Sequence, residues 1–386
     1  MNINVQNKIV KKLKKFYKKK KIYLHEPSFD SLDIYHLNKC LKSTMVSTAG
    51  EYVRKFESEI EKFTNSKNAI VVLNGTIGIE LCLKVLGVKQ NEEVILPCLT
   101  FVAPASAIVN VGAIPHFASI NESDLGINTF ELENYLSKIC VMKKGKCFNK
   151  KTKRFISAIV PVHVFGHSCN IIEIIRISKK FNLKVLEDAA DALGTYFKNK
   201  HVGTFSKLGV LSFNGNKTIT TGCGGAILTN DIITAKKIRH LISTAKVGHN
   251  YLYIHDKFGF NYRLPAINSS IGYSQMLKIK NILNKKRKLF LSYKKLFTEY
   301  KEISVLEEPK NSKSNFWLQT IILKKDNPKK IRNRFLKELN KQGIMARAAW
   351  TLIPDLNPYK IFPKMLLKKS RKISESLINI PSSFYK

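Results

Sequence analysis

The sequence predicts an α/β protein with a mostly parallel central sheet, and three observations lead to this prediction. From about residue 68 to residue 230, short apolar runs typical of buried strands alternate with stretches that have helical spacing. Small or polar residues follow several of these runs just before the next helix begins. The 386 residues are 44% hydrophobic, which is enough for a large core and more than one domain. We expect an N-terminal helical segment and arm over 1–45, a large α/β domain over 46–275 and a smaller α/β domain over 276–386.

The chain begins with a cationic segment, residues 8–21, whose apolar residues recur at helical spacing. A basic amphipathic helix can lie on a membrane or on nucleic acid, or it can dock onto its own protein. We favour docking, because lysines occur along the whole chain and the formal charge of +38 reflects a general compositional bias. We therefore expect no dedicated nucleic-acid site, and no apolar run is long enough to be a transmembrane segment.

The seven cysteines are dispersed and form no C-x-x-C pair. Such a set is typical of reduced thiols, and no secretory signal is recognisable, so we expect a cytoplasmic protein. His163, His167 and Cys169 are close in sequence, but a fourth ligand at suitable spacing is missing, and no metal site is expected.

The first strand–turn–helix unit follows an amphipathic helix expected over residues 47–66. An apolar strand beginning near Asn68 leads to the small-residue turn Asn74–Thr76 and then to a helix. This arrangement offers backbone N–H groups to an anion. The segment has neither a Walker A lysine nor a G-x-G-x-x-G pattern, and an ordinary βα turn is the alternative.

Later strands repeat the pattern. Phe101 lies in the loop after the strand Val94–Leu96, where it could face a ligand or fill the core. His163 and Asp188 each come at the end of a buried strand, although Asp188 could instead cap a helix. Because ligands bind at the carboxyl ends of parallel strands, we expect these residues and the 212–217 turn on one rim of the sheet.

Lys217 differs from the other lysines of the chain. Most of them lie in clusters typical of solvated surface, whereas Lys217 lies between two strand-like runs and is flanked by small residues. If this side chain is confined, burial favours its neutral amine, which is a nucleophile that can form a Schiff base. A hairpin turn with a surface lysine is the alternative.

The remaining chain completes the two-domain pattern. Residues 141–154 form a charged insertion that we expect as an exposed hairpin or loop. A polar loop carries the turn Asn261–Pro265, and a long helix from about residue 272 leads to the second α/β region. There the run that begins at Phe316 predicts a strand, and the next helix ends at Gly343.

Taken together, these segments show that the chain resembles the sugar aminotransferases of the DegT/DnrJ/EryC1/StrS family. The resemblance covers nearly the whole chain, from His25 to Ser383. The motifs that carry the resemblance are NGTIGIEL, LPCLTFVAP, PVHVFGH, LEDAADALG, SFNGNKTITTGCGG and FNYRLPAINSSIG. The resemblance implies the fold type I of enzymes that depend on pyridoxal 5'-phosphate, with a smaller C-terminal α/β domain. The segments LHEPSF, VSTAGEYVRKFE and KCFNKKTKR are most similar to the LegC-type branch of the family. That branch aminates C4 of UDP-linked 4-keto-6-deoxy-N-acetylhexosamines, on the way to bacillosamine- or legionaminic-acid-type surface sugars.

The resemblance assigns roles to individual residues. It implies that Lys217 forms the Schiff base and that Asp188 pairs with the pyridine nitrogen, where a carboxylate helps the ring to accept electrons. Asp191 stands where many members have Gln or His beside the ring hydroxyl. The other implied cofactor residues stack on the ring or hold its phosphate: Phe101, Gly75, Thr76, Ser212 and Asn261.

The resemblance also implies partners. Asn261 would come from the second subunit of a homodimer, with Arg263 near the same interface site, and His163 and Arg263 would contact the substrate. L-glutamate is the expected amino donor, and a nucleotide-linked keto sugar is the acceptor.

Four alternatives remain open at this point. The chain could act at C3 or on another 4-keto sugar, or it could be a catalytically idle scaffold or sensor that keeps the cofactor fold. A dehydrating branch of the family has histidine in place of the lysine, so Lys217 argues against that chemistry. A polyanion- or membrane-binding protein that uses residues 8–21 is the fourth alternative.

Overall fold

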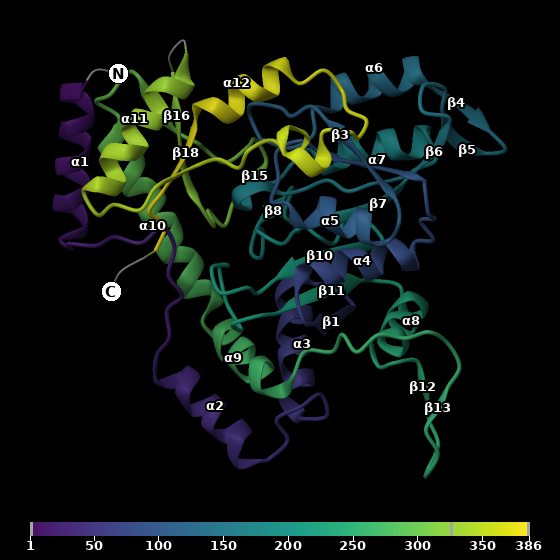
Figure 1. The fold of residues 1–386 in the computed structure, drawn as a ribbon. Helices are drawn as coiled ribbons and strands as arrows, with labels where there is room; N and C mark the ends of the chain where they lie inside the picture. The colour runs from purple at the N-terminus through teal and green to yellow at the C-terminus, as the bar shows by residue number, and fades with distance from the viewer. Residues whose placement is uncertain (1–2, 325–326, 384–386) are drawn as a thin grey trace.

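The computed structural model describes residues 3–324 and 327–383, and its main feature is a nine-stranded sheet (Figure 1). The strands run in the order β1-β11-β10-β7-β6-β2-β3, and a β4–β5 hairpin pairs with β6. The four pairs from β10 to β3 are parallel, whereas β11 is antiparallel to both of its neighbours. This arrangement confirms the predicted α/β class, but the sheet is mixed: its central strands are parallel, whereas the pairings of β1, β11, β4 and β5 are antiparallel. The strands are β1 Asn68–Val72, β2 Glu93–Pro97, β3 Ile114–Ala118, β4 Cys140–Lys143, β5 Lys146–Asn149, β6 Arg154–Ile159, β7 Lys184–Asp188, β10 Leu208–Ser212 and β11 Gly225–Thr229.

Two hydrophobic cores lie on the two faces of this sheet. Successive strand residues alternate between them, so that Ile70 and Val72 join one core while Ala69 and Val71 join the other. This is why the strands read as continuous apolar runs and not as an alternation of apolar and polar residues. The first core is covered by α4 Gly75–Val85, α5 Ala103–Asn110 and α8 Ile232–Ile242, and the second by α3 Glu51–Thr64, α6 Thr129–Ile139, α7 Ile171–Lys180 and α9 Ala266–Leu277.

A smaller α/β unit follows the helix α10, Ile279–Phe297, and has its own hydrophobic core. Its antiparallel sheet has the order β14-β16-β18-β17, and two helices pack beside it. These elements are β14 Ile303–Val305, β16 Gln319–Leu323, β17 Arg347–Ala348, β18 Leu377–Ile380, α11 Pro328–Lys341 and α12 Lys368–Ser376.

The N-terminal helix α1, Ile3–Tyr17, docks onto this smaller unit next to α11 (Figure 1). Ile9, Val10 and Leu13 are buried in the same core as α10 and β16. The docking that we favour from the sequence is therefore confirmed, because the apolar face of the helix is already used. The next helix, α2 Ser31–Lys42, packs against α9.

Short elements fill the connections. The charged insertion forms the exposed β4–β5 hairpin, as expected. A second hairpin, β12–β13, extends away from the body of the protein (Figure 1). The remaining elements are β8 Tyr196–Phe197, β9 Lys200–His201, β12 Lys246–Val247, β13 Ile254–His255, β15 Ser312–Lys313, and the 3-10 turns Val164–Gly166, Ile353–Asp355 and Asn357–Tyr359. Within residues 3–324 and 327–383, none of the helices combines the length and the apolar character needed to span a bilayer.

Candidate active site

A cavity of about 470 Å³ lies at the carboxyl ends of the central strands, and both domains contribute to its walls. The loops after β1, β2, β7 and β10 supply one side, and residues on and next to β16, β17 and β18 supply the other. Seven of the residues predicted from the sequence line it: Gly75, Thr76, Phe101, Asp188, Asp191, Ser212 and Lys217. The parallel strands bring them together because their carboxyl ends meet at one edge.

Lys217 follows β10 in a tight turn, in which its backbone N–H donates to the carbonyl of Asn214 at 2.9 Å. Its Nζ lies 2.5 Å from Oδ1 of Asp191 and 4.0 Å from the centre of the Trp317 ring. The side chain is 12% exposed, so the alternative of a surface lysine is wrong. A carboxylate on one side and an aromatic face on the other hold the amine at the cavity wall.

Asp188 is the last residue of β7 and is almost completely buried. Its Oδ1 accepts a hydrogen bond from the N–H of Ala190 at 3.0 Å, and turns rather than a helix follow, so it does not cap a helix. Burial, and to a smaller extent the neighbouring carboxyl of Asp191, raises the pKa of the Asp188 carboxyl to about 6. Asp188 forms no ion pair with any residue that the structure describes.

Asp191 brings a second buried carboxyl into the cavity. Burial raises its pKa, and this effect outweighs the attraction of Lys217 although the two side chains are in contact. Asp191 and Lys217 form an ion pair, because a lysine amine 2.5 Å from a carboxylate favours the charged form of that carboxylate. One carboxyl, that of Asp188, then remains without a cation.

The N-terminus of α4 forms an anion cradle. The side chain of Asn74 caps the helix by accepting from the N–H of Ile77 at 3.0 Å, and the N–H groups of Gly75 and Thr76 precede the first helical hydrogen bonds. Ser212 at the end of β10 lies beside them: a Cβ on Gly75 would be only 3.2 Å from the Cβ of Ser212. Backbone donors, a hydroxyl and the positive end of a helix are the groups that bind a phosphate.

Aromatic side chains form the opposite wall. The ring of Trp350 lies between Phe101 at 6.1 Å and Trp317 at 6.3 Å, measured between ring centres. The half-exposed Phe101 faces this wall and does not fill the core. Arg347 on β17 also lines the cavity, and it forms no ion pair with a described residue.

Sequence reasoning missed Trp317, Arg347 and Trp350. Only the strand beginning at Phe316 was recognised around Trp317, and the stretch with Arg347 and Trp350 carries no periodic signal. These residues reach the cavity through packing of the small domain on the large one, which local patterns do not encode.

His163 was expected to bind substrate, but the structure places it elsewhere. Its ring is completely buried, with Nε2 3.3 Å from a carboxylate oxygen of Glu187, and Nδ1 accepts from the N–H of Cys169. The reason is strand alternation: Val162 pairs with Asp188 and lines the cavity, so the next side chain points to the opposite face. The prediction that His163 contacts the substrate is therefore wrong, because its side chain does not reach the cavity.

Asn261 and Arg263 do not line the cavity of their own chain. Asn261 is exposed and pairs with Ser243, while Arg263 pairs with Val72 at the edge of the central sheet. Their predicted role depends on a second subunit and stays a prediction.

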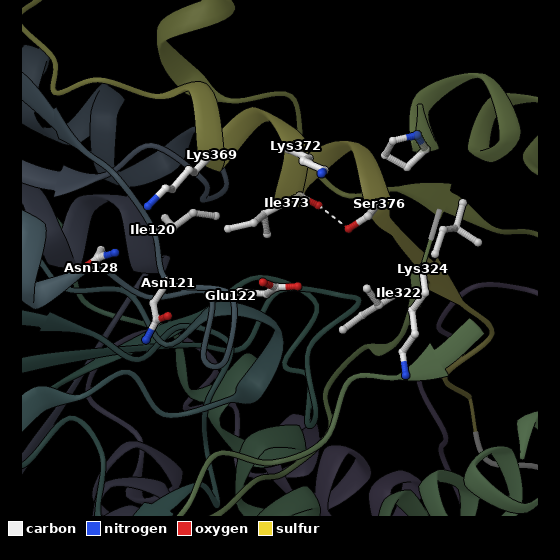
Figure 2. Close-up of a pocket in the computed structure, with 12 residues that line it drawn as sticks. Ile120, Asn121, Glu122, Asn128, Ile322, Lys324, Lys369, Lys372, Ile373 and Ser376 are labelled. Atoms are coloured by element: carbon white, nitrogen blue, oxygen red, sulfur yellow. Dashed lines mark hydrogen bonds between the residues drawn. The ribbon is translucent and has the colours of Figure 1, made fainter. Parts of the chain in front are cut away.

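A larger hollow of about 650 Å³ lies between α12, β16 and the loop after β3 (Figure 2). Figure 2 shows the carboxylate of Glu122 near its middle and Ile373 and Ser376 of α12 above it. The other charged residues at this hollow are Lys324, Lys369 and Lys372. It shares no residue with the Lys217 cavity and holds no buried titratable group, so size alone does not identify the site.

Comparisons with known proteins show which family the chain resembles. The family model described as DegT/DnrJ/EryC1/StrS aminotransferase family matches residues 27–384. GDP-perosamine synthase of Escherichia coli O157:H7 is 34% identical over 303 residues, which are 78% of each chain. The UDP-4-amino-4,6-dideoxy-N-acetyl-beta-L-altrosamine transaminase of Campylobacter jejuni is 31% identical over 303 residues, 78% of this chain and 76% of that one. Among solved structures, Helicobacter pylori PseC, an aminotransferase involved in the biosynthesis of pseudoaminic acid, superposes with a TM-score of 0.84 at 26% identity over 94% of each chain.

Proposed function

The chain belongs to the DegT/DnrJ/EryC1/StrS aminotransferase family, and from this premise we propose that it transfers an amino group from L-glutamate to the C4 ketone of a UDP-linked 4-keto-6-deoxy-N-acetylhexosamine. As a member of this family it is a sugar aminotransferase that depends on pyridoxal phosphate. The observation that carries the proposal is the convergence of Lys217, Asp188 and the N-terminus of α4 on one cavity.

The residues present fit this cofactor. Its phosphate suits the cradle of Gly75, Thr76 and Ser212, where a side chain on Gly75 would crowd the Cβ of Ser212. Its pyridinium nitrogen suits Asp188, a buried carboxyl that has no cationic partner among the described residues. Its aldehyde suits the amine of Lys217, which lines the same cavity.

The protein's part in the reaction follows from these positions. The bound cofactor supplies an electron sink for the charge that remains when a proton leaves the α-carbon of the amino donor. Asp188 holds a proton at the ring nitrogen and so keeps the sink effective. Nζ of Lys217 takes the proton from the α-carbon as general base and returns it as general acid. Asp191 and Trp317 keep that nitrogen at the cavity wall, and Phe101 and Trp350 limit the access of water.

The choice of substrate rests on the resemblance to the LegC-type branch and on the UDP-sugar transaminase among the relatives. GDP-perosamine synthase is also a relative, at 34% identity, and this favours a GDP-linked 4-keto sugar as the second candidate. Both substrates are anionic. Apart from Lys217, Arg347 is the cation among the described residues that line the cavity, and we assign it to the substrate's anionic groups.

We also propose that the enzyme is a cytoplasmic homodimer in which Asn261 and Arg263 of each subunit complete the cavity of the other. The dispersed thiols support the location. Exposed aromatic side chains support the dimer, because Tyr251, Tyr253 and the fully exposed Phe258 precede Asn261. Light scattering after gel filtration measures the assembly, and a monomer that keeps full activity would refute the shared site.

The decisive experiment combines cofactor trapping with product analysis. Borohydride reduction of the protein loaded with pyridoxal phosphate should fix the cofactor to the peptide that carries Lys217, and mass spectrometry identifies the peptide. Lys217→Ala should lose both this label and all turnover. Lys207→Ala is the matched control, since Lys207 is an exposed lysine next to β10 that pairs with Asp231.

Purified enzyme, glutamate and either the UDP- or the GDP-linked 4-keto sugar are then incubated, and the product is analysed by NMR. A 4-amino sugar supports the proposal, and the preferred nucleotide separates the two candidates. Loss of a hydroxyl without amination would instead indicate dehydration. Trapping without any reaction of glutamate would favour the idle scaffold, and transaminase activity in Lys217→Ala would refute the assignment.

A further inference from the structure

A second lysine, Lys286, is completely buried outside the cavity. It lies on α10, on which Lys288 and Lys294, in contrast, are exposed. Lys286 forms no ion pair with a described residue. Its Nζ instead lies 3.0 Å from the carbonyl oxygen of Trp317, 2.8 Å from that of Ser382 and 2.5 Å from Nε2 of His25. Burial lowers the pKa of the Lys286 amine well below its usual value, and a neutral lysine amine still has two N–H donors. The amine donates to the two carbonyls and makes its third contact with the ring of His25, so three contacts fix its position.

The three residues that contact the Lys286 amine belong to three segments that are distant in sequence. His25 lies in the arm after α1, Trp317 precedes β16, and Ser382 follows β18. The arm and the C-terminal segment also bond to each other, because the N–H of Ser382 donates to the carbonyl of Leu24 at 2.6 Å. Leu24 and Trp317 both line the Lys217 cavity. Lys286 therefore joins three segments directly behind the cavity wall.

Trp317 continues the connection to the active site. Its indole N–H donates to the carbonyl of Asn216 at 2.6 Å, and its ring lies 4.0 Å from Nζ of Lys217. Its backbone carbonyl is the group that Lys286 holds. Consequently, one buried side chain fixes the backbone of the residue that supports both the turn and the amine of Lys217.

We propose that Lys286 is a positioning residue for Lys217, acting through Trp317 and tying the arm and the C-terminal segment to the same point. This role rests on the proposed function, in which Nζ of Lys217 moves the proton. Electrostatics agree with the geometry: the pKa of His25 lies well below its usual range because of burial, then because of Lys286 and Lys217. His25 is therefore within electrostatic reach of both lysines.

The test measures the placement of Trp317 separately from catalysis. The chain has two tryptophans, so Trp350→Phe leaves Trp317 as the sole indole. In this background, without cofactor, Lys286→Met should raise the quenching of Trp317 fluorescence by acrylamide about twofold or more, because the two carbonyls lose their donor and the wall loosens. In the native background, kcat should fall about tenfold or more while KM for both substrates stays within about threefold, as expected when a catalytic group is misplaced.

Lys278→Met is the matched control. Lys278 also ties the arm to the start of α10, through Asp30 and Asp33, but it does not contact Trp317. This variant should lower thermal stability while leaving quenching and kcat close to those of the native protein. If Lys286→Met gives the same quenching and kcat as the control, the proposal is overturned.

Lys286→Gln decides the matter if the methionine variant does not fold, because its amide keeps two donors for the carbonyls. Intermediate quenching and kcat support the proposal, and values equal to those of the control overturn it. If the native enzyme shows no transaminase activity, the proposed function fails, but the quenching experiment still tests whether Lys286 places Trp317.

Discussion

Replacing Asp188 with asparagine should make the cofactor-free protein more stable while removing its activity. Asp188 is buried, and asparagine has nearly the same shape and can keep the hydrogen bond from Ala190 through its own oxygen. The variant therefore removes a charge with little change in packing. Without cofactor, no described cation pairs directly with this charge, and the weaker attraction of Lys217 does not offset the cost of burying it, so the charge opposes folding.

The expected gain follows from the pKa of Asp188. Burial raises this pKa from 3.8 to about 6. Each tenfold change in proton affinity corresponds to about 1.4 kcal/mol, so the ionised carboxylate destabilises the fold by about 3 kcal/mol. Because the pKa in the folded state is the higher one, the folded protein binds the proton more tightly. The contribution of the protonated Asp188 carboxyl to the free energy of unfolding is therefore fully present below about pH 4 and is lost as the pH rises through about 6.

Urea unfolding of the cofactor-free native protein and of Asp188→Asn, at several pH values, measures the difference in free energy of unfolding. The advantage of the variant should be small near pH 4 and should approach about 3 kcal/mol near pH 8. Other groups titrate in both proteins and largely cancel, except Asp191, whose carboxyl is coupled to Asp188. A difference that does not depend on pH, or a variant less stable than the native protein at pH 8, would refute the reasoning. Addition of cofactor should reverse the order, because its ring cation pairs with the carboxylate.

Two further predictions concern ligands. Gly75→Ala should weaken binding of pyridoxal phosphate about tenfold or more, because the new methyl group would lie 3.2 Å from the Cβ of Ser212 and narrow the anion cradle. Absorbance titration measures the affinity, and an unchanged Kd would show that the cradle does not bind the phosphate of the cofactor. Arg347→Met should raise KM for an anionic substrate about tenfold with a smaller change in kcat, since a charge-assisted contact contributes about 1.5–3 kcal/mol. Steady-state kinetics, with the concentration of glutamate and of the nucleotide sugar varied in turn, show which substrate Arg347 binds. If the variant has the same KM as the native enzyme for both substrates, Arg347 binds neither.

The fold was predictable because its signals are local. Continuous apolar runs bounded by small residues identified the strands that are buried on both faces, and helical spacing between them implied parallel connections. The order of the strands was not predictable in the same way. The antiparallel β11 sits between β1 and β10, and β1 pairs with a strand more than 150 residues later in the sequence.

The structure brings predicted residues to one cavity wherever the end of a strand decides their position. Asp188 and Ser212 end β7 and β10, and Gly75 begins the helix after β1, so topology alone brings them to one edge. The same reasoning failed for His163, because it identified the strand end but not the face. A shift of one residue along a strand turns the side chain to the other side of the sheet, and the pairing of Val162 with Asp188 fixed that choice.

The surroundings of Lys217 explain why the rest of the site stayed hidden. Its carboxylate partner, Asp191, comes from the large domain 26 residues away, but the ring beneath it, Trp317, comes from the small domain. The indole N–H bonds to the carbonyl of Asn216, across a sequence separation of 101 residues. The amine is thus held by one contact within its domain and by one across the domain boundary. Only the contact with Asp191 depends on a nearby sequence motif. The position of Trp317 depends instead on how α10, the arm and the C-terminal segment meet at Lys286.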